Sequence, residues 1–388
     1  MTGRTGPALE GRWDTYVLHQ GNEALNFWRK RFSVGPVNVL FVAGLGFDPR
    51  AAIAIETLLN LGGAGSRELL ILEFDEGPES PSKVHADLVH TNSDRLSRLF
   101  AAPRTLRRVA VSMFSADRRI SSLSASRIFQ RVDDVAPFDD VIVDISSLPR
   151  SIYFPLIAKI LFLVDRLRTV ERTVNLHVIV SENAALDRRI LDVGLEEAAE
   201  YIHYFRGGVD REGTTNHPRL WIPLLGEGQL AKLEKINALV RPDEICPVLP
   251  FPAMNPRRAD DLVLEYHRFL FDDLRVEPRN FIFASETNPF QVYRQIRRAV
   301  NHYTETLDPL GPCKVVLSAL TSKVLSVGAL LVACELKEAK MSVGIAHVEV
   351  QGYELRPEDG VGNDSDSQLF DIWITGDCYE TTTREAPC

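Results

Sequence analysis

A glycine-spaced loop near the start of the chain contains the first residues that could bind a ligand. Gly44 and Gly46 follow the apolar run Val39–Ala43, and Asp48 and Arg50 come directly after them. Glycines after a strand allow backbone N–H groups to approach a phosphate at the start of the next helix. Asp48 could equally cap that helix, which would make the loop a purely structural turn. The sequence leaves both interpretations open.

Two further loops combine small hydroxyl side chains with a cation. Ser146 and Ser147 precede Arg150, and a similar loop contains Ser318, Thr321, Ser322 and Lys323. This combination suits an anionic or phosphorylated ligand. Because serine and threonine also cap helices, a structural role is the alternative for both loops.

Carboxylates at the ends of predicted strands complete the candidate set. Glu73 and Asp75 end one strand, and Asp144 ends another that should be buried, where a carboxylate is costly unless it is paired or functional. Arg150 is the nearest partner for Asp144. A loop in the second half adds Ser285, Glu286 and Asn288.

Several kinds of active site find no support in the sequence. No lysine follows the Gly44 loop as in a P-loop, there is no H-E-x-x-H motif, and no G-x-S-x-G turn surrounds Ser146. We therefore expect no bound metal. The five cysteines are widely scattered, so we expect buried free thiols rather than disulfides.

The elements that must position these residues follow an alternating pattern. Continuously apolar strands alternate with amphipathic helices, which is typical of a parallel sheet covered on both faces. The predicted strands of the first half are residues 39–45, 68–75, 109–114, 140–146 and 176–180. Ligands of such sheets bind beyond the carboxyl ends of the strands. The candidate residues therefore lie where a ligand is expected.

The second half repeats this order of strands and loops. Leu220–Gly228 resembles the opening strand and its two glycines, and Leu317–Lys323 resembles Ile145–Ser151, each followed by a long apolar helix. We predict an α/β protein with two tandem Rossmann-like lobes, mainly parallel sheets and an internal duplication. The alternative is that two unrelated doubly wound domains share the same pattern.

The predicted organisation has five segments. Residues 1–34 form an aromatic N-terminal arm, 35–205 the first lobe, 206–217 a linker, 218–356 the second lobe, and 357–388 an acidic loop with a terminal strand and tail. The arm or the terminal strand could contact a protein partner.

Composition excludes some functions. A formal net charge of −9 argues against binding polymeric nucleic acid, which usually requires a cationic surface. No apolar run is long enough to span a bilayer, and the N-terminus lacks the apolar core of a signal peptide. We therefore expect a cytoplasmic protein without a membrane partner.

The loop Ser318–Lys323 and the helix after it resemble the CRISPR-associated Rossmann-fold sensor domains, and the tandem layout resembles their fused double version in bacterial antiphage signalling. This resemblance implies a site for a nucleotide-like ligand between the lobes, lined by Gly44–Arg50, Ser146–Arg150, Ser285–Asn288 and Ser318–Lys323. The glycine-rich form of the family's basic loop is absent, and no effector domain is recognisable.

The Gly44 loop and the following acidic strand also resemble motifs of S-adenosylmethionine-dependent carboxyl methyltransferases. That resemblance implies that Gly44 and Gly46 lie under the amino-acid part of the cofactor, while Glu73 or Asp75 binds its ribose hydroxyls. Those enzymes have a single lobe, so the second half would have no role.

Three functions therefore remain open from the sequence. A sensor or regulatory protein would bind a nucleotide-like or phosphorylated ligand without any cofactor and would need both Arg150 and Lys323. An enzyme would use S-adenosylmethionine or another nucleotide and would need chiefly the Gly44 loop and Glu73. A structural subunit of a larger complex would need none of these residues.

Overall fold

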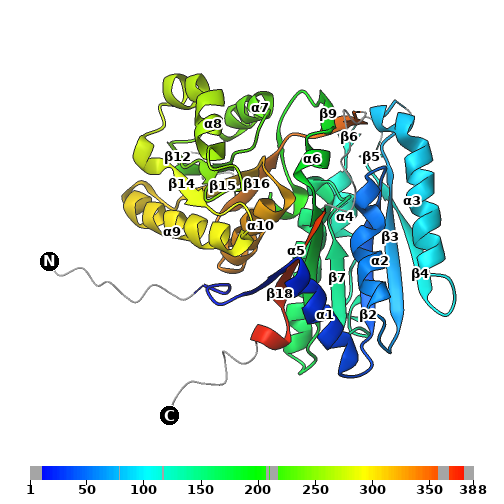
Figure 1. Cartoon of the computed structure of the whole chain (residues 1–388). Coiled ribbons are helices and arrows are strands. Elements are labelled where there is room, and N and C mark those ends of the chain that lie inside the picture. Colours follow the sequence, from blue (N-terminus) through cyan, green and yellow to red (C-terminus); the bar gives the residue numbers. More distant parts are fainter. Residues whose placement is uncertain are drawn as a thin grey trace, which may run out of the picture. The chain divides into compact units, whose positions relative to one another are not determined.

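The computed structural model describes residues 11–77, 79–115, 118–206, 209, 217–356 and 367–379. It divides into two compact units, and both are α/β with mostly parallel sheets, as the sequence predicts (Figure 1). The larger unit comprises Val17–Gly207, Leu230–Arg241 and Gly344–Cys388. The smaller unit comprises Met1–Tyr16, Gly208–Gln229 and Pro242–Val343.

The sequence predicts contiguous lobes, whereas the compact units are discontinuous. The predicted arm is divided, because Gly11–Tyr16 belong to the smaller unit while β1 (Val17–Gln20) and α1 (Asn22–Ser33) belong to the larger one. Strand pairing between distant parts of the chain causes this arrangement, and local patterns do not reveal it. Most of the predicted linker and acidic loop lies outside the described residues.

The larger unit has a seven-stranded sheet in the order β1-β18-β8-β7-β2-β3-β4. Five strands are parallel: β2 (Val39–Leu45), β3 (Arg67–Asp75), β4 (Thr105–Ser112), β7 (Asp140–Asp144) and β8 (Asn175–Glu182). The terminal strand β18 (Gln368–Thr375) pairs antiparallel with both β8 and β1. It therefore lies inside the chain's own sheet.

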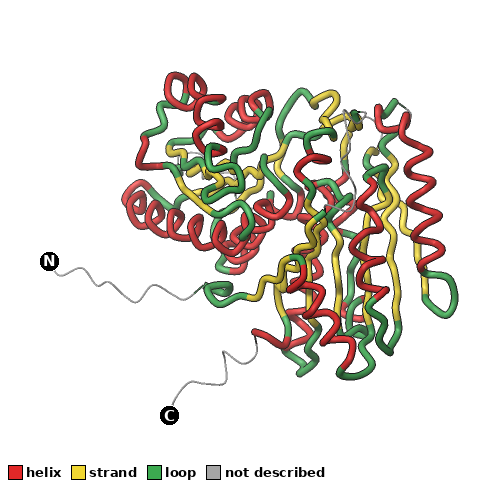
Figure 2. Tube along the Cα trace, viewed as in Figure 1, coloured by secondary structure: helices red, strands yellow, loops and turns green. Residues whose placement is uncertain are grey.

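Three helices cover one face of this sheet. They are α1, α2 (Ile53–Asn60) and α3 (Ala86–Leu99), which lie along the strands in Figures 1 and 2. Their apolar side chains form one core with the sheet residues that point the same way, including Trp28, Ile55, Leu96, Phe41 and Ile71. Burial of these side chains supplies the main driving force for folding of this layer.

The long helix α5 (Arg150–Arg168) packs against β8 and β18 and does not share that core. Thirteen of its residues are buried, which explains why its sequence is apolar nearly all round. Two layers of helices thus enclose the sheet, so its central strands are apolar on both faces.

The smaller unit contains the parallel strands β15 (Lys314–Ala319), β11 (Arg219–Leu224), β13 (Val248–Pro250) and β14 (Ile282–Ala284), in that spatial order. The order matches β7-β2-β3-β4 of the larger unit, with the corresponding strands in the same sequence positions. The predicted duplication requires this match. Helices α9 (Pro289–Leu307) and α10 (Lys323–Glu338) pack against each other in this unit.

Short elements complete both units. They are α4 (Ser121–Ser126), α6 (Ala184–Asp187), α7 (Leu230–Val240), α8 (Arg258–Glu265), β5 (Phe114–Ser115), β6 (Arg118–Arg119), β9 (Ile190–Leu195), β10 (Glu200–Tyr201), β12 (Glu244–Ile245), β16 (Val343–His347) and β17 (Val350–Leu355). The short 3-10 helices are η1 (Pro49–Ala52), η2 (Pro81–His85), η3 (Val132–Asp134), η4 (His203–Phe205), η6 (Pro278–Asn280), η7 (Asp308–Leu310) and η9 (Asp377–Tyr379), and η5 (Arg268–Asp273) is a π-helix.

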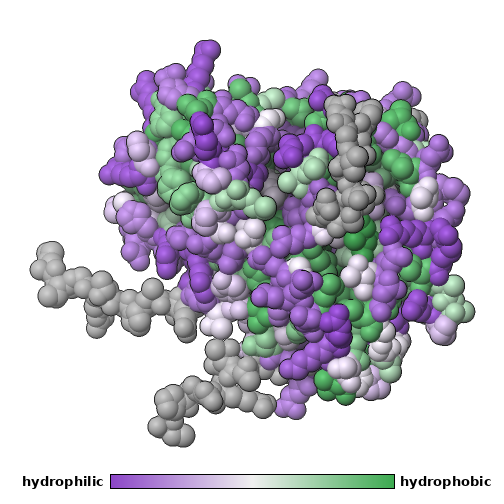
Figure 3. Space-filling view, in the orientation of Figure 1, coloured by the Kyte–Doolittle hydropathy of each residue, from purple (hydrophilic) through white to green (hydrophobic). Residues whose placement is uncertain are grey.

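None of the described helices is long and apolar enough to cross a bilayer. On the face shown in Figure 3, hydrophilic side chains cover much of the region around α3, whose only buried residues are Asn92 and Leu96.

A pair of glycines between α2 and β3 allows a matched test of backbone geometry. Gly65 has a φ of +104°, and a Cβ there would lie 2.3 Å from the Val37 carbonyl oxygen, whereas Gly62 has a φ of +77° and open space. We expect Gly65→Ala to lower the free energy of unfolding by about 2 kcal/mol or more, and Gly62→Ala by about 1 kcal/mol. Urea titration of both variants measures the difference. Equal losses would show that contact with Val37 does not matter.

Candidate anion-binding site

The strand order of the larger sheet reverses between β2 and β7, where a Rossmann-like sheet usually binds its ligand. The two loops that follow these strands contact each other directly. The Ser147 hydroxyl donates to the Gly44 carbonyl at 2.7 Å, and a Cβ at Gly44 would lie 2.7 Å from Leu148 and 2.8 Å from Phe74. Protein atoms therefore pack closely around Gly44.

Asp48 and Arg50 have structural partners. The Asp48 carboxylate accepts a hydrogen bond from the Arg50 backbone at 2.9 Å and forms an ion pair with the Arg50 side chain at 2.8 Å, and Asp187 pairs with the same guanidinium at 2.8 Å. Burial alone would lower the pKa of Arg50, but Asp48 and Asp187 raise it well above its ordinary value. Of the two interpretations of this loop, the geometry favours the capped structural turn. The Asn92 side chain stabilises the same turn, because its amide donates a hydrogen bond to the Gly46 carbonyl.

The remaining candidates in this unit lie at the expected edge of the sheet. Asp144 is buried and accepts a hydrogen bond from the Ser146 backbone at 2.9 Å, while the Ser146 hydroxyl accepts one from Ser181. Glu73 pairs with Arg108 at 2.6 Å on the surface. Asp75 is the last residue of β3.

In the smaller unit, the predicted polar residues at strand ends have local roles. Ser318 accepts a hydrogen bond from the Trp221 indole at 3.0 Å, and Ser322 caps α10. Asn288 caps α9. Thr321 is buried, and Lys323 is the first residue of α10.

Glu286 and Ser285 are also held locally. Glu286 pairs with Arg258 at 2.9 Å and accepts a hydrogen bond from the Met254 backbone, while the Ser285 backbone donates to the Gln291 side chain at 2.7 Å. These contacts order the loop between β14 and α9.

A group of charged residues that the sequence analysis did not single out lies near the β9–β17 ribbon, the two-stranded antiparallel sheet formed by β9 and β17. The Arg119 guanidinium pairs with Glu196 at 3.0 Å, lies 3.9 Å from the Glu349 carboxylate and donates to the Val350 carbonyl at 2.5 Å. Only 8% of the Arg119 side chain is exposed. One arginine thus joins the hairpin β5–β6 to the ribbon.

Glu349 is the most deeply buried carboxylate of this group. It accepts a hydrogen bond from the Ser121 hydroxyl at 2.6 Å and lies 3.8 Å from the His347 imidazole. Burial alone would raise its pKa, but His347, Ser121 and Arg119 together lower the pKa of Glu349 to about 2. The side chain is therefore ionised throughout the physiological pH range.

Lys232, in the first turn of α7, is the second buried cation. Only 7% of its side chain is exposed, and its amine pairs with the Asp192 carboxylate of the ribbon. Burial lowers the pKa of Lys232; Asp192 counteracts this shift, and the charge of Arg150 adds to it. The predicted residue Arg150 thus acts electrostatically on a lysine that the sequence analysis missed.

Tyr353 completes the group. Its backbone lies opposite Asp192 in the ribbon, and its backbone N–H donates to the Ser82 hydroxyl at 3.0 Å. Burial raises the pKa of the Tyr353 hydroxyl well above its ordinary value, and the charges of Asp192 and Glu349 add to this shift. The phenol therefore remains a neutral hydrogen-bond donor at physiological pH.

We name this group the Lys232 cluster; its members are Arg119, Ser121, Arg150, Asp192, Glu196, Lys232, His347, Glu349 and Tyr353. Burying paired charges gives little stability, because desolvation offsets most of the attraction between them. Such groups are accordingly common at functional sites. Three cations and a phenol donor can bind an anion such as a phosphate, and the carboxylates can accept hydrogen bonds from hydroxyl groups.

The sequence contains a signal for part of this cluster. Lys232 follows the Gly226 and Gly228 loop as the first cation of the next helix, and His347 and Glu349 come directly at the end of β16. The rule that ligand residues follow strand ends would have found them. Asp192 and Tyr353 carry no such signal, because only their pairing in the ribbon brings them together.

The ionisation of Glu349 predicts a measurable pH dependence of stability. Its pKa is lower in the folded protein than the ordinary value of 4.5, so its contribution is complete above pH 4.5 and is lost as the pH falls toward about 2. Between pH 6 and pH 3, wild-type protein should lose about 2 kcal/mol that Glu349→Gln does not lose. Urea titration across this range tests the prediction. Parallel curves would contradict it.

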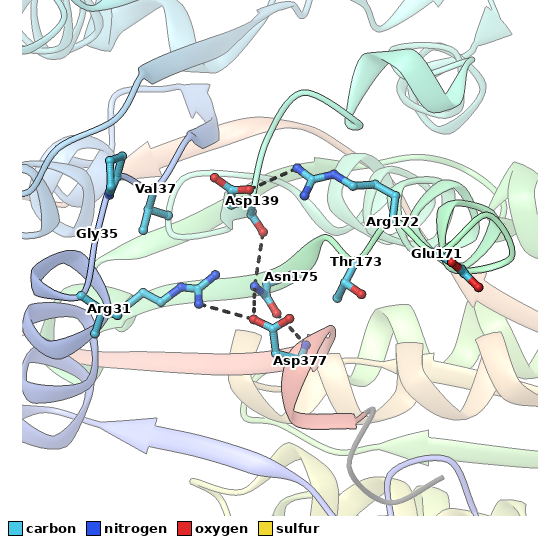
Figure 4. Close-up of a pocket in the computed structure, with 11 residues that line it drawn as sticks. Arg31, Gly35, Val37, Asp139, Glu171, Arg172, Thr173, Asn175 and Asp377 are labelled. Atoms are coloured by element: carbon cyan, nitrogen blue, oxygen red, sulfur yellow. Dashed lines mark hydrogen bonds and ion pairs between the residues drawn. The ribbon is translucent and has the colours of Figure 1, made fainter. Parts of the chain in front are cut away.

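A pocket of about 440 Å³ lies at the opposite, amino-terminal edge of the larger sheet, lined by residues that include Arg31, Asp139, Arg172, Asn175 and Asp377 (Figure 4). Their side chains pair with one another: Arg31 with Asp377 at 3.4 Å and Arg172 with Asp139 at 3.1 Å, while the Asn175 amide donates to Asp377. These contacts fix the end of β18 to the start of β8. The pocket therefore has a structural explanation, and we place the candidate site at the Lys232 cluster.

Within the described ranges, no three histidine, cysteine, aspartate or glutamate side chains are grouped as a metal site would require. Cys246, Cys313 and Cys334 are buried free thiols, as expected, and Cys378 is a half-buried free thiol.

Comparison with known proteins gives little further information. No protein-family model matches the sequence, and no curated protein matches it. Among solved structures, the chain is similar to a putative UDP-N-acetylglucosamine 2-epimerase from Listeria monocytogenes, with 8% identity and a TM-score of 0.20, covering 79% of this chain and 88% of the other. A likeness of this degree carries no argument about the chemistry of the chain.

Proposed function

We propose that this protein binds a nucleotide-like or phosphorylated small ligand through the Lys232 cluster and acts as a sensor or regulatory protein. One observation carries the proposal: two nearly buried cations from separate elements, Arg119 and Lys232, pair with carboxylates on or directly after β9. Arg150, whose charge acts on Lys232, follows β7 at the carboxyl end of the strand, where α/β proteins bind ligands.

The composition of the cluster favours binding over acid–base chemistry. The Glu349 carboxylate lies near a cation and a histidine and accepts a hydrogen bond from a hydroxyl, and its pKa of about 2 makes it a poor proton acceptor near neutral pH. Arginine and lysine, by contrast, are charged donors suited to phosphate oxygens.

The methyltransferase alternative receives less support from the geometry. It requires the Gly44 loop and the acidic end of β3, yet Asp48 and Arg50 pair with each other and Glu73 pairs with Arg108. S-adenosylmethionine would have to compete with these contacts. A structural subunit remains the third candidate.

The location between the lobes and the role in antiphage defence follow only from the family resemblance, and both remain predictions. Substitution of Lys323, which belongs to the smaller unit, tests the predicted location between the lobes separately from the Lys232 cluster.

A thermal-shift screen of the purified chain tests the proposal. The panel comprises inorganic diphosphate, mononucleotides, NAD, S-adenosylmethionine and cyclic di- and oligonucleotides. A ligand that binds only the folded state raises the melting temperature by mass action. We expect phosphate-bearing ligands to do so in the wild type and to lose the effect in Lys232→Ala. Stabilisation by S-adenosylmethionine alone would favour the enzyme, and no stabilisation by any ligand would contradict the proposed function.

A further inference from the structure

Two cations of the Lys232 cluster, Lys232 and Arg119, are already paired with carboxylates on or directly after β9. Asp192 lies on β9 and pairs with Lys232, and Glu196, directly after β9, pairs with Arg119 at 3.0 Å. Both carboxylates keep partial exposure, 31% for the Asp192 side chain and 35% for Glu196. The two cations themselves are nearly buried, with 7% of the Lys232 side chain and 8% of the Arg119 side chain exposed.

An anion approaching Lys232 would meet the negative charge of Asp192 at the same amine. Two anions at one cation repel each other, and the repulsion is strong where burial lowers the effective dielectric constant. Binding of an anion to Lys232 therefore requires the Asp192 carboxylate to move away from the Lys232 amine. We propose that Asp192 is a built-in competitor that occupies the anion site of Lys232 until a phosphate group displaces it. This inference rests on the proposed function.

The ribbon gives the displacement a structural consequence. Asp192 lies opposite Tyr353 in the ribbon, and the Tyr353 backbone donates to Ser82 beside α3. Movement of the Asp192 side chain thus takes place next to a hydrogen bond that joins the ribbon to the body of the unit. Ligand binding at Lys232 therefore affects a segment next to the hydrogen bond that joins the ribbon to Ser82.

The competition predicts effects of opposite sign for the two members of the ion pair. Removing the cation weakens binding, whereas removing the competing charge strengthens it. Using inorganic diphosphate as the probe and calorimetry as the measurement, we expect Asp192→Asn to lower the Kd about tenfold. Lys232→Ala should raise it, and the double variant should show no gain from Asp192→Asn, because the competitor acts only through Lys232.

A matched control separates local competition from net charge. Asp133→Asn removes one negative charge from an exposed carboxylate that pairs with Arg131 on the surface, and it should leave the Kd unchanged. Thermal melting of each variant without ligand confirms that it is folded.

The outcomes distinguish this inference from the proposed function. Tighter binding in Asp192→Asn together with an unchanged Asp133→Asn supports the competition. Wild-type binding with equal or weaker affinity in Asp192→Asn overturns the competition alone. No binding of diphosphate by either the wild type or Asp192→Asn overturns the competition, and if no ligand of the thermal-shift panel stabilises the protein either, the proposed function is overturned as well.

Discussion

Arg150→Ala and Lys232→Ala should each weaken the binding of ATP or inorganic diphosphate by about ten- to a hundredfold while leaving the protein folded. A charged donor to a phosphate contributes about 1.5 to 3 kcal/mol, which corresponds to this range. Lys232 is the buried amine of the cluster, and the charge of Arg150 acts on it. Both substitutions should therefore weaken the affinity for the same ligand. Calorimetric titration of each variant measures them.

Lys235→Ala is the matched control, because Lys235 lies on the same helix and donates to the Glu197 carbonyl at 2.7 Å outside the cluster. It should bind like the wild type. Lys323→Ala tests the predicted second loop: weaker binding would support a ligand that also uses the smaller unit. Unchanged affinity in both Arg150→Ala and Lys232→Ala would contradict the sensor function.

Asp371→Ala should have the largest effect on stability, with a loss of about 3 to 5 kcal/mol, as expected when one partner of a buried charged group is removed. The Asp371 carboxylate is fully buried and bonds His177 of β8 at 2.8 Å and His19 of β1 at 3.3 Å. Burial alone would raise its pKa, but the two histidines lower the pKa of Asp371 below its ordinary value. One carboxylate thus connects three neighbouring strands.

Chemical denaturation of Asp371→Ala at pH 7 measures this loss. His19→Gln is the control, since the His19 side chain is 20% exposed and its longer contact should contribute only about 1 kcal/mol. A loss below about 1 kcal/mol for Asp371→Ala would show that the three strands are held by apolar packing alone.

Much of the fold could be predicted because it depends on local patterns. The apolar segment at 39–45 and the mainly apolar segment at 140–146 became β2 and β7, and the repeated order of strands in the second half appears in the smaller sheet. The spatial placement of the chain ends could not be predicted. Pairing of β18 with β8 joins residues nearly two hundred positions apart, and no local pattern indicates which strand is its neighbour.

The candidate site was predicted only in part. Arg150 was singled out because it follows a strand, and its charge acts on Lys232 of the proposed site. Asp48 and Arg50 have the same kind of position, yet their side chains pair with each other. Residue type and spacing cannot distinguish these cases, because whether a charge is already satisfied depends on contacts such as that between Arg50 and Asp187.

The most direct test of the central claim is a crystal structure of the full chain with the phosphate-bearing ligand that stabilises it best. We predict phosphate oxygens within about 3 Å of the Lys232 amine, with the Asp192 carboxylate moved away from that amine. Ligand bound at the Gly44 loop, with the ion pair between Lys232 and Asp192 intact, would contradict the account.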